Sequence, residues 1–141
     1  MSTEKVAVNR KQIGGEVPMV VSEIIEQGLY TGLFGSIDSA RMAQVTELIT
    51  FKCEELKTKI VIIDLANVDA IDTAVSAHLI SLGRVLELIG VQIIFCGING
   101  SLARTMVTAE VQFGGLKIVR DLKEAVTYAY SLTGFQVIKA G

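Results

Sequence analysis

The sequence lacks the features by which several classes of protein bind their targets. Its formal net charge is −2, so it has no positive field to attract nucleic acid or anionic lipid. Its longest largely apolar runs, at 60–63 and 91–96, fall far short of the roughly 18 to 20 residues that a membrane-spanning helix needs. Residues 1–16 mix charges with glycines and contain no apolar core of a secretory signal. We therefore expect a cytoplasmic protein that binds neither nucleic acid nor a membrane.

Histidine and cysteine are also scarce. His78 is the only histidine, whereas a zinc site needs several such ligands and a nucleophile needs a base that titrates near neutral pH. Cys53 and Cys96 lie inside apolar-periodic segments, which predicts core residues in a reducing compartment. The glycines form neither a Gly-x-Gly-x-x-Gly nor a Walker pattern. The sequence therefore predicts a protein without enzyme activity, metal or cofactor.

Apolar residues, by contrast, are abundant. The chain has 141 residues, of which 50% are hydrophobic, and its mean hydropathy is +0.51. That length fits one domain with a real core. Because no membrane span absorbs the excess of apolar residues, we expect part of the surface to be covered by a partner chain. Self-association, most simply as a homodimer, is the first inference.

Apolar period and turn residues alternate along the chain in a regular way. Two strands, predicted to form a hairpin, come first, and helices then alternate with strands. The strands at 59–65 and 91–98 are almost continuously apolar, which is typical of strands covered on both faces. The predicted strands are 17–25, 29–35, 59–65, 91–98 and 117–120, and the predicted helices are 39–56, 73–89, about 99–111 and 121–132.

This order predicts an α/β fold with a mainly parallel sheet of about five strands and about four helices. We predict one domain over 17–134, preceded by a flexible lead-in at 1–16 and followed by a tail at 135–141.

The predicted helix at 73–89 has a wide apolar arc. One stripe suffices for a helix on a sheet, so the wider arc indicates cover from a second source. Either a partner chain or neighbouring helices of the same domain can provide it. The clearly polar positions are few: Ser76, His78, Ser81, Arg84 and Glu87.

Three acids, Asp64, Asp69 and Asp72, fall within nine positions where the strand at 59–65 gives way to this helix. Carboxylates bind magnesium or calcium, but the spacing matches no EF-hand loop. A phospho-accepting aspartate of the receiver type would need a further acid pair and a lysine after a late strand, and the sequence offers neither.

The remaining interpretation concerns Asp72 and Thr73. Asp72 can accept from backbone donors of the first helical turn, and Thr73 would then present its hydroxyl to solvent at the positive end of the helix dipole. A capping aspartate followed by a tolerated threonine is the simple interpretation. The alternative is that Thr73 is a phosphoacceptor. The dipole would favour a phosphate by roughly 0.3 to 1 kcal/mol, whereas Asp69 and Asp72 would each repel it by about 1 kcal/mol or more. Such a charge would change partner binding more than it would stabilise the domain.

The stretch from 60 to 107 resembles the STAS domain of bacterial anti-sigma-factor antagonists, and most closely its stressosome branch. The family pattern is a buried strand that ends in Asp-Leu, an Asp-Ser or Asp-Thr that opens a helix, then Leu-Gly and a second buried strand. In this chain these are Asp64 and Leu65, Asp72 and Thr73, Ile89 and Gly90, and the strand from 91.

The resemblance implies a non-enzymatic regulator that a serine/threonine kinase phosphorylates and a matching phosphatase restores. It also implies assembly with other STAS proteins of a stressosome-like shell built on dimers. Thr73 takes the phosphoacceptor position, and Thr105, in Ala-Arg-Thr where Ala-Gln-Thr is usual, is the second candidate. The predicted partner surface that flanks the phosphosite is Asn67, Asp69, Asp72 and His78.

A second class of function stays open. In it, the domain binds a nucleotide or metabolite without phosphorylation, either at the cluster of acidic residues or through the loop at Asn99, Gly100 and Ser101. This loop departs from the Pro-Glu start that is usual in the scaffold members of the family.

Overall fold

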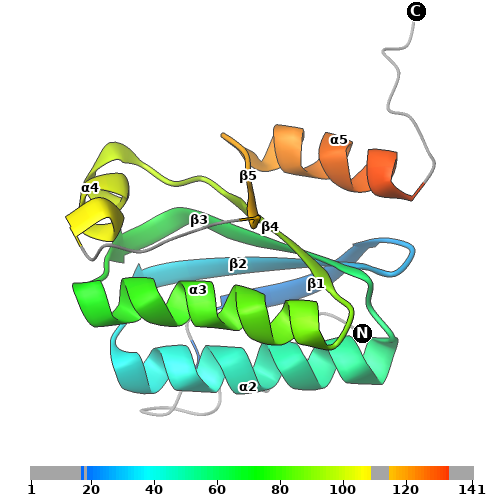
Figure 1. The fold of residues 1–141 in the computed structure, drawn as a ribbon, viewed down its shortest axis with the longest axis horizontal. Helices are drawn as coiled ribbons and strands as arrows, with labels where there is room; N and C mark the ends of the chain where they lie inside the picture. Colours follow the sequence, from blue (N-terminus) through cyan, green and yellow to red (C-terminus); the bar gives the residue numbers. More distant parts are fainter. Residues whose placement is uncertain (1–16, 18, 109–114, 134–141) are drawn as a thin grey trace, which may run out of the picture.

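The computed structural model describes residues 17, 19–108 and 115–133 (Figure 1). The predicted lead-in at 1–16 and tail at 135–141 lie outside the described residues. The elements follow the predicted order: β1 (Met19–Ile25), β2 (Gly28–Ser36), α2 (Ser39–Leu56), β3 (Ile60–Ala70), α3 (Thr73–Leu88), β4 (Gln92–Cys96), α4 (Gly100–Thr108), β5 (Lys117–Ile118) and α5 (Leu122–Leu132).

The five strands form one sheet in the order β1-β2-β3-β4-β5. β1 pairs antiparallel with β2, and the remaining neighbours pair parallel. The predicted hairpin and mainly parallel sheet are thus confirmed. In Figure 1, α2 and α3 lie along one face of the sheet, α5 lies along the other, and α4 lies at one end.

The two central strands are covered on both faces. On β3, Val61 and Ile63 pack in the core that includes α2 and α3, while Ile60 and Ile62 face the core under α5. β4 divides in the same way, with Phe95 in the first core and Cys96 in the second. This double coverage explains why both strands were visible in the sequence as continuous apolar runs.

β3 is longer than the prediction of 59–65, because it continues to Ala70 beside β2. Of residues 66–70 only Val68 is buried, so this part of the strand has one covered and one exposed face. A strand of that kind shows polar residues in its sequence, so the pattern of 66–70 does not distinguish it from a loop. The pairing of Ser36 with Ala70 carries β2 and β3 together up to the start of α3.

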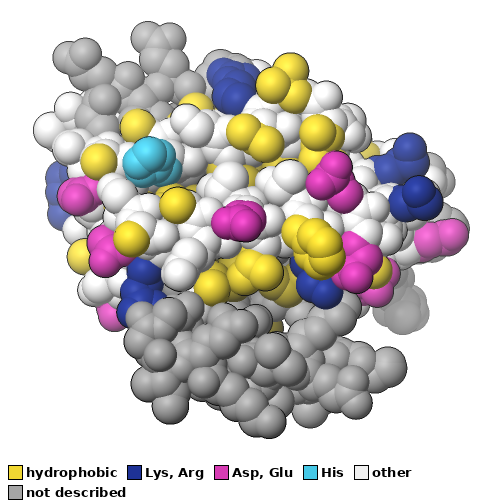
Figure 2. All heavy atoms as spheres, turned by 90° about the horizontal axis from the view of Figure 1, so that it is seen from below, with side chains coloured by type: hydrophobic (Ala, Val, Ile, Leu, Met, Phe, Trp, Pro, Cys, Tyr) yellow, Lys and Arg dark blue, Asp and Glu magenta, His cyan; other side chains and the backbone are white. Residues whose placement is uncertain are grey.

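The wide apolar arc of α3 is only partly covered by its own domain. Its main stripe is buried, and Ile80 packs against the same core. Val85, Leu88 and Ile89 stay exposed, with 88% of Leu88 accessible. Figure 2, a view from the side of α2 and α3, shows hydrophobic side chains at the surface among charged ones. Cover by neighbouring helices of the same domain is therefore wrong for these three residues.

Among the described residues, none of the helices combines the length and the apolar character required to cross a bilayer.

Both cysteines are buried and free, as predicted. Burial is the main cause that raises the pKa of the Cys53 thiol from 9.0 to about 11, with a smaller contribution from Glu54. Burial also raises the pKa of Cys96 from 9.0 to about 12, and the neighbouring Asp64 adds to the effect through its charge and a hydrogen bond. In the unfolded chain both thiols ionise near their usual pKa.

The two thiols predict a loss of stability at alkaline pH. Their contribution is complete below about pH 9 and disappears as the pH rises toward 12, because only the unfolded chain ionises in that window. We expect the free energy of unfolding of the wild type to fall, relative to a Cys53→Ala/Cys96→Ala variant, by roughly 1 to 3 kcal/mol per pH unit above pH 9. Urea titrations at several pH values measure this difference, and parallel curves would contradict it.

Candidate functional site

The four helices that the structure describes after the hairpin begin at one edge of the sheet, because each follows the carboxyl end of a parallel strand. Each also begins in the same chemical way, with an aspartate or asparagine side chain that accepts a hydrogen bond from the backbone N–H three residues later. The pairs and their distances are Asp38 with Arg41 at 2.8 Å, Asp72 with Val75 at 2.8 Å, Asn99 with Leu102 at 2.8 Å, and Asp121 with Glu124 at 3.0 Å.

Thr73 lies at this edge as the first residue of α3. Asp72 precedes it with an extended backbone (φ −96°, ψ −178°) and caps the helix, and both residues are exposed. The carbonyl of Asp72 accepts the backbone N–H of Ser76 and also the Ser76 hydroxyl, each at 3.1 Å. The predicted cap and the exposed position of Thr73 are confirmed. The first turn of α3 is therefore held by its own residues.

The three acids do not form one cluster. Asp69 and Asp72 are both exposed around the start of α3, whereas Asp64 is buried in β3 and has a different set of partners. Its carboxylate accepts from the Tyr30 hydroxyl at 2.8 Å and from the Ala66 N–H at 3.1 Å. Within the part of the chain that the structure describes, no three acidic, histidine or cysteine side chains are arranged to hold a metal ion.

The other two residues of the predicted partner surface are exposed but lie apart from each other. Asn67 is on the extension of β3, where it pairs with Phe34 of β2. His78 follows Thr73 by five residues, which at about 100° per residue turns it to another side of α3. Asn67 and Asp69 therefore belong to the sheet edge, and His78 belongs to the outer side of the helix.

Thr105 is less accessible than Thr73. It lies half-buried within α4, and its hydroxyl donates to the carbonyl of Ser101 at 3.2 Å. α4 itself packs against α3. A kinase would have to break this hydrogen bond and reach into the middle of a helix, whereas Thr73 stands at a helix start.

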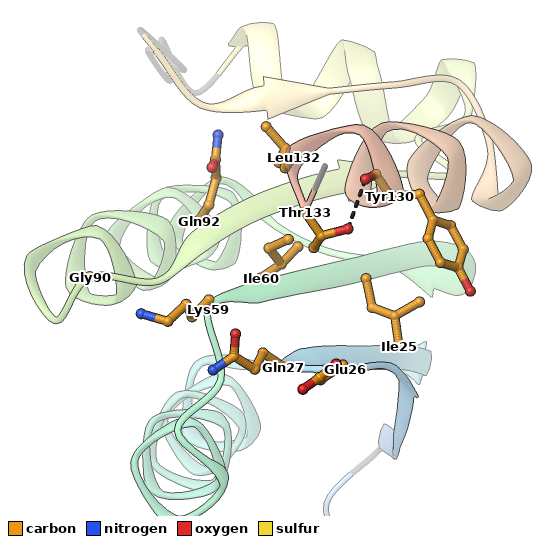
Figure 3. A pocket seen from close by; sticks show the side chains of 10 residues that line it. All are labelled: Ile25, Glu26, Gln27, Lys59, Ile60, Gly90, Gln92, Tyr130, Leu132 and Thr133. Carbon is orange, nitrogen blue, oxygen red and sulfur yellow. Dashed lines mark hydrogen bonds between the residues drawn. The ribbon is translucent and has the colours of Figure 1, made fainter. Parts of the chain in front are cut away.

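The loop proposed for a small ligand serves as a helix start instead. Asn99 caps α4 through its side chain, and its carbonyl accepts the N–H of Ala103 at 2.9 Å. Two surface cavities of about 480 and 550 Å³ lie at the opposite edge of the sheet. Figure 3 shows the first, between the hairpin turn, the starts of β3 and β4, and the end of α5. Neither is lined by Asn99, Gly100 or Ser101.

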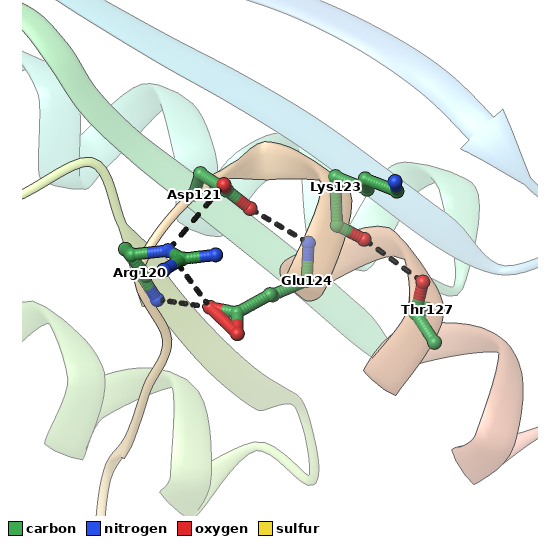
Figure 4. Close-up of polar contacts among 5 residues, drawn as sticks. All are labelled: Arg120, Asp121, Lys123, Glu124 and Thr127. Carbon is green, nitrogen blue, oxygen red and sulfur yellow. Dashed lines mark hydrogen bonds and ion pairs between the residues drawn. The ribbon is translucent and has the colours of Figure 1, made fainter.

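The start of α5 has polar contacts that the sequence analysis did not single out (Figure 4). Asp121 caps the helix, and Glu124 accepts from the Arg120 N–H at 2.9 Å. The Arg120 guanidinium lies 3.7 Å from Asp121 and 3.9 Å from Glu124, with all three side chains exposed. An aspartate followed three residues later by a glutamate is a known start signal, so the sequence did contain this information.

A family model described as "STAS domain" matches residues 21–125. The chain belongs to the STAS family. The match includes the Asp72–Thr73 helix start and α4, and it confirms the predicted resemblance.

Among curated STAS relatives, the RsbT co-antagonist protein RsbRA of Bacillus subtilis (strain 168) is 23% identical over 141 residues, all of this chain and 52% of RsbRA. The chain thus spans about half the length of this relative. Among solved structures, the anti-sigma factor antagonist SpoIIAA in its unphosphorylated form has a TM-score of 0.66 at 12% identity, over 86% of this chain and 99% of that one. A chain from a structure of the stressosome, called a signal integration and transduction hub, has a TM-score of 0.64 at 19% identity, over 80% of this chain and 97% of that one.

Substitution of Asp72 separates its hydrogen bond from its charge. Asp72→Ala removes the acceptor for the Val75 N–H, and we expect the free energy of unfolding to fall by about 0.5 to 2 kcal/mol. Asp72→Asn keeps an acceptor oxygen without the charge and should cost only a few tenths of a kcal/mol. Thermal or urea unfolding measures both, and equal losses would argue against a capping role.

Proposed function

We propose that this STAS protein is a non-enzymatic regulator, an anti-sigma-factor antagonist or a stressosome component, whose partner binding is switched by phosphorylation of Thr73. The observation that carries the proposal is the exposed threonine at the first position of α3, directly after its capping aspartate. A hydroxyl at a helix start on the molecular surface is open to another enzyme. The proposed location is the cytoplasm.

The charges around Thr73 give phosphorylation a physical effect. A phosphate adds about −1.5 to −2 charge and three acceptor oxygens. The dipole of α3 favours that charge, but Asp69 and Asp72 repel it, so the net effect on folding is small. The effect on a docking partner is large, because the surface changes from two exposed carboxylates to a strongly anionic patch.

The names of the relatives support the class of partner. SpoIIAA is described as an anti-sigma factor antagonist with an unphosphorylated form, and RsbRA is described as a co-antagonist of RsbT. By analogy, we propose a serine/threonine kinase, a matching phosphatase and other STAS proteins as partners of this chain. Thr105 is the second proposed phosphoacceptor, ranked lower because its hydroxyl is already hydrogen-bonded within α4.

Ligand binding without phosphorylation is the weaker alternative. Neither of the two cavities described above is lined by Asn99, Gly100 or Ser101, so neither supports a ligand at that loop.

Phosphate mapping tests the switch. We expect the full chain, incubated with ATP and a serine/threonine kinase that acts on STAS proteins, to gain one phosphate at Thr73 by mass spectrometry. Thr73→Ala should lose it, and Thr73→Ser should keep it, because serine supplies the same hydroxyl. Thr105→Ala is the matched control and should be modified like the wild type. Phosphate on neither threonine, with a ligand that raises the melting temperature, would favour the alternative.

The uncovered residues of α3 support the proposed assembly with other STAS chains or a second copy of this one. Val85 and Leu88 of α3 and the C-cap residue Ile89 follow i, i+3, i+4 spacing and so lie on one side of the end of the helix. Exposed apolar side chains grouped in this way mark protein contacts.

A charge on that side should weaken self-association. We expect Leu88→Lys to raise the dimer dissociation constant by about tenfold or more, because truncated or charged interface centres commonly cost over 1 kcal/mol. Val107→Lys, on α4 with 76% of its surface exposed, is the control and should leave the constant unchanged. Sedimentation equilibrium measures both, and a wild type that stays monomeric at high concentration would refute the dimer.

A further inference from the structure

The buried carboxylate of Asp64 is a junction between three strands. Only 8% of the residue is exposed. Oδ2 accepts the Tyr30 hydroxyl of β2 at 2.8 Å, and Oδ1 accepts the Ala66 N–H of its own strand at 3.1 Å. On the other side, Asp64 pairs in register with Cys96, the last residue of β4.

The Ala66 hydrogen bond lies where β3 contains an extra residue. Gly32 of β2 pairs with Asp64, but Phe34, two residues later, pairs with Asn67, three residues later in β3. Such a bulge changes the direction of a strand and decides which side chains face outward. It redirects β3 between Asp64 and Asn67, and a second register shift, where Gly35 and Ser36 pair with Val68 and Ala70, follows before Thr73.

The same carboxylate also borders the loop that follows β4. Gly97 has a left-handed backbone (φ 77°), and a Cβ there would lie 2.7 Å from both the Asp64 Oδ1 and the Ala66 nitrogen. The Gly97 N–H in turn donates to the Arg120 carbonyl at 3.1 Å. Gly97 leads to Asn99 and α4, so the loop before Thr105 packs directly on the bulge.

We propose that Asp64 is a positioning residue that sets, through the bulge at Ala66 and the close packing of Gly97, the arrangement of the two segments that lead into α3 and α4, the helices that carry the candidate phosphoacceptors. One acceptor group thereby couples the start of α3 to the start of α4. The effect of this positioning on phosphorylation rests on the proposed function. The structural coupling between the two segments does not, because it follows from the contacts of Asp64 and Gly97 alone.

Four substitutions test these contacts. Asp64→Leu removes both acceptor oxygens at similar size, and Asp64→Asn keeps one of them. Tyr30→Phe removes a single donor. Gly97→Ala disturbs the junction from the β4 side, since its Cβ would meet the carboxylate.

Three control variants accompany these substitutions. Thr31→Val removes a buried hydroxyl from the residue next to Tyr30, and that hydroxyl has no hydrogen-bond partner among the described residues. Gly100→Ala adds a Cβ at the first residue of α4, three residues after Gly97, with nothing nearer than 3.6 Å. Val45→Ala lowers stability from α2, far from the junction along the chain.

Amide NMR and hydrogen exchange on the full chain give the decisive measurement. We expect Asp64→Leu to move the amide signals of both 66–73 and 97–101, and to speed exchange of the Ala66 N–H by about tenfold, the usual effect of losing one buried hydrogen bond. Gly97→Ala should move the same two groups, and Asp64→Asn and Tyr30→Phe should move them less. The three controls should leave the loop before Thr73 unchanged.

Changes confined to the three strands, with 69–73 and 98–101 unmoved, would overturn the inference. If Asp64→Leu does not fold, Tyr30→Phe and Gly97→Ala decide it by the same criterion.

Kinase assays separate positioning from loss of folded protein. With the kinase that modifies the wild type, Asp64→Asn should raise the KM for Thr73 phosphorylation severalfold, whereas Val45→Ala should leave KM unchanged. An equal KM in both variants would also overturn the inference. If no kinase modifies Thr73 but both loops still move in the NMR spectra, the proposed function fails and the positioning role stands.

Discussion

The burial of β3 and β4 between two helical layers is the constraint on which the rest of the structure depends. Both strands must run parallel and end at the same edge, so every helix that covers them begins there. The topology itself therefore brings the helix starts, among them the exposed Thr73, together at one edge of the sheet. The hairpin of β1 and β2 extends this frame, and its pairing with the late part of β3 supports the strand as far as the start of α3.

Burial of a strand on both faces also determined which strands could be predicted from the sequence. The runs that contain Ile62 and Ile94 were recognisable because neither face of their strands meets water. The segment around Asn67 was missed, since a strand with one exposed face carries polar residues that resemble a loop. Asp72 and Thr73 were predictable because capping is local chemistry, three residues in range. The Asp64 junction was not, because Tyr30 is 34 residues away and only the pairing of the strands brings it near.

The division of the acids is the main correction to the site. Three carboxylates close in sequence suggested a single acidic cluster. The sheet instead buries Asp64, which accepts hydrogen bonds within the fold, and leaves Asp69 and Asp72 at the surface. The three acids are close together in the sequence, but they differ in burial, and their structural roles differ accordingly.

The first turn of α3 needs no outside help, since Asp72 and Ser76 supply its hydrogen bonds from both side chain and backbone. A covalent group on Thr73 would therefore leave the helix wound as before. The modified and unmodified domains would have the same backbone conformation, so no conformational change would transmit the modification. The partner protein would then have to distinguish the two forms by the added charge and volume alone, because the domain itself would not change conformation.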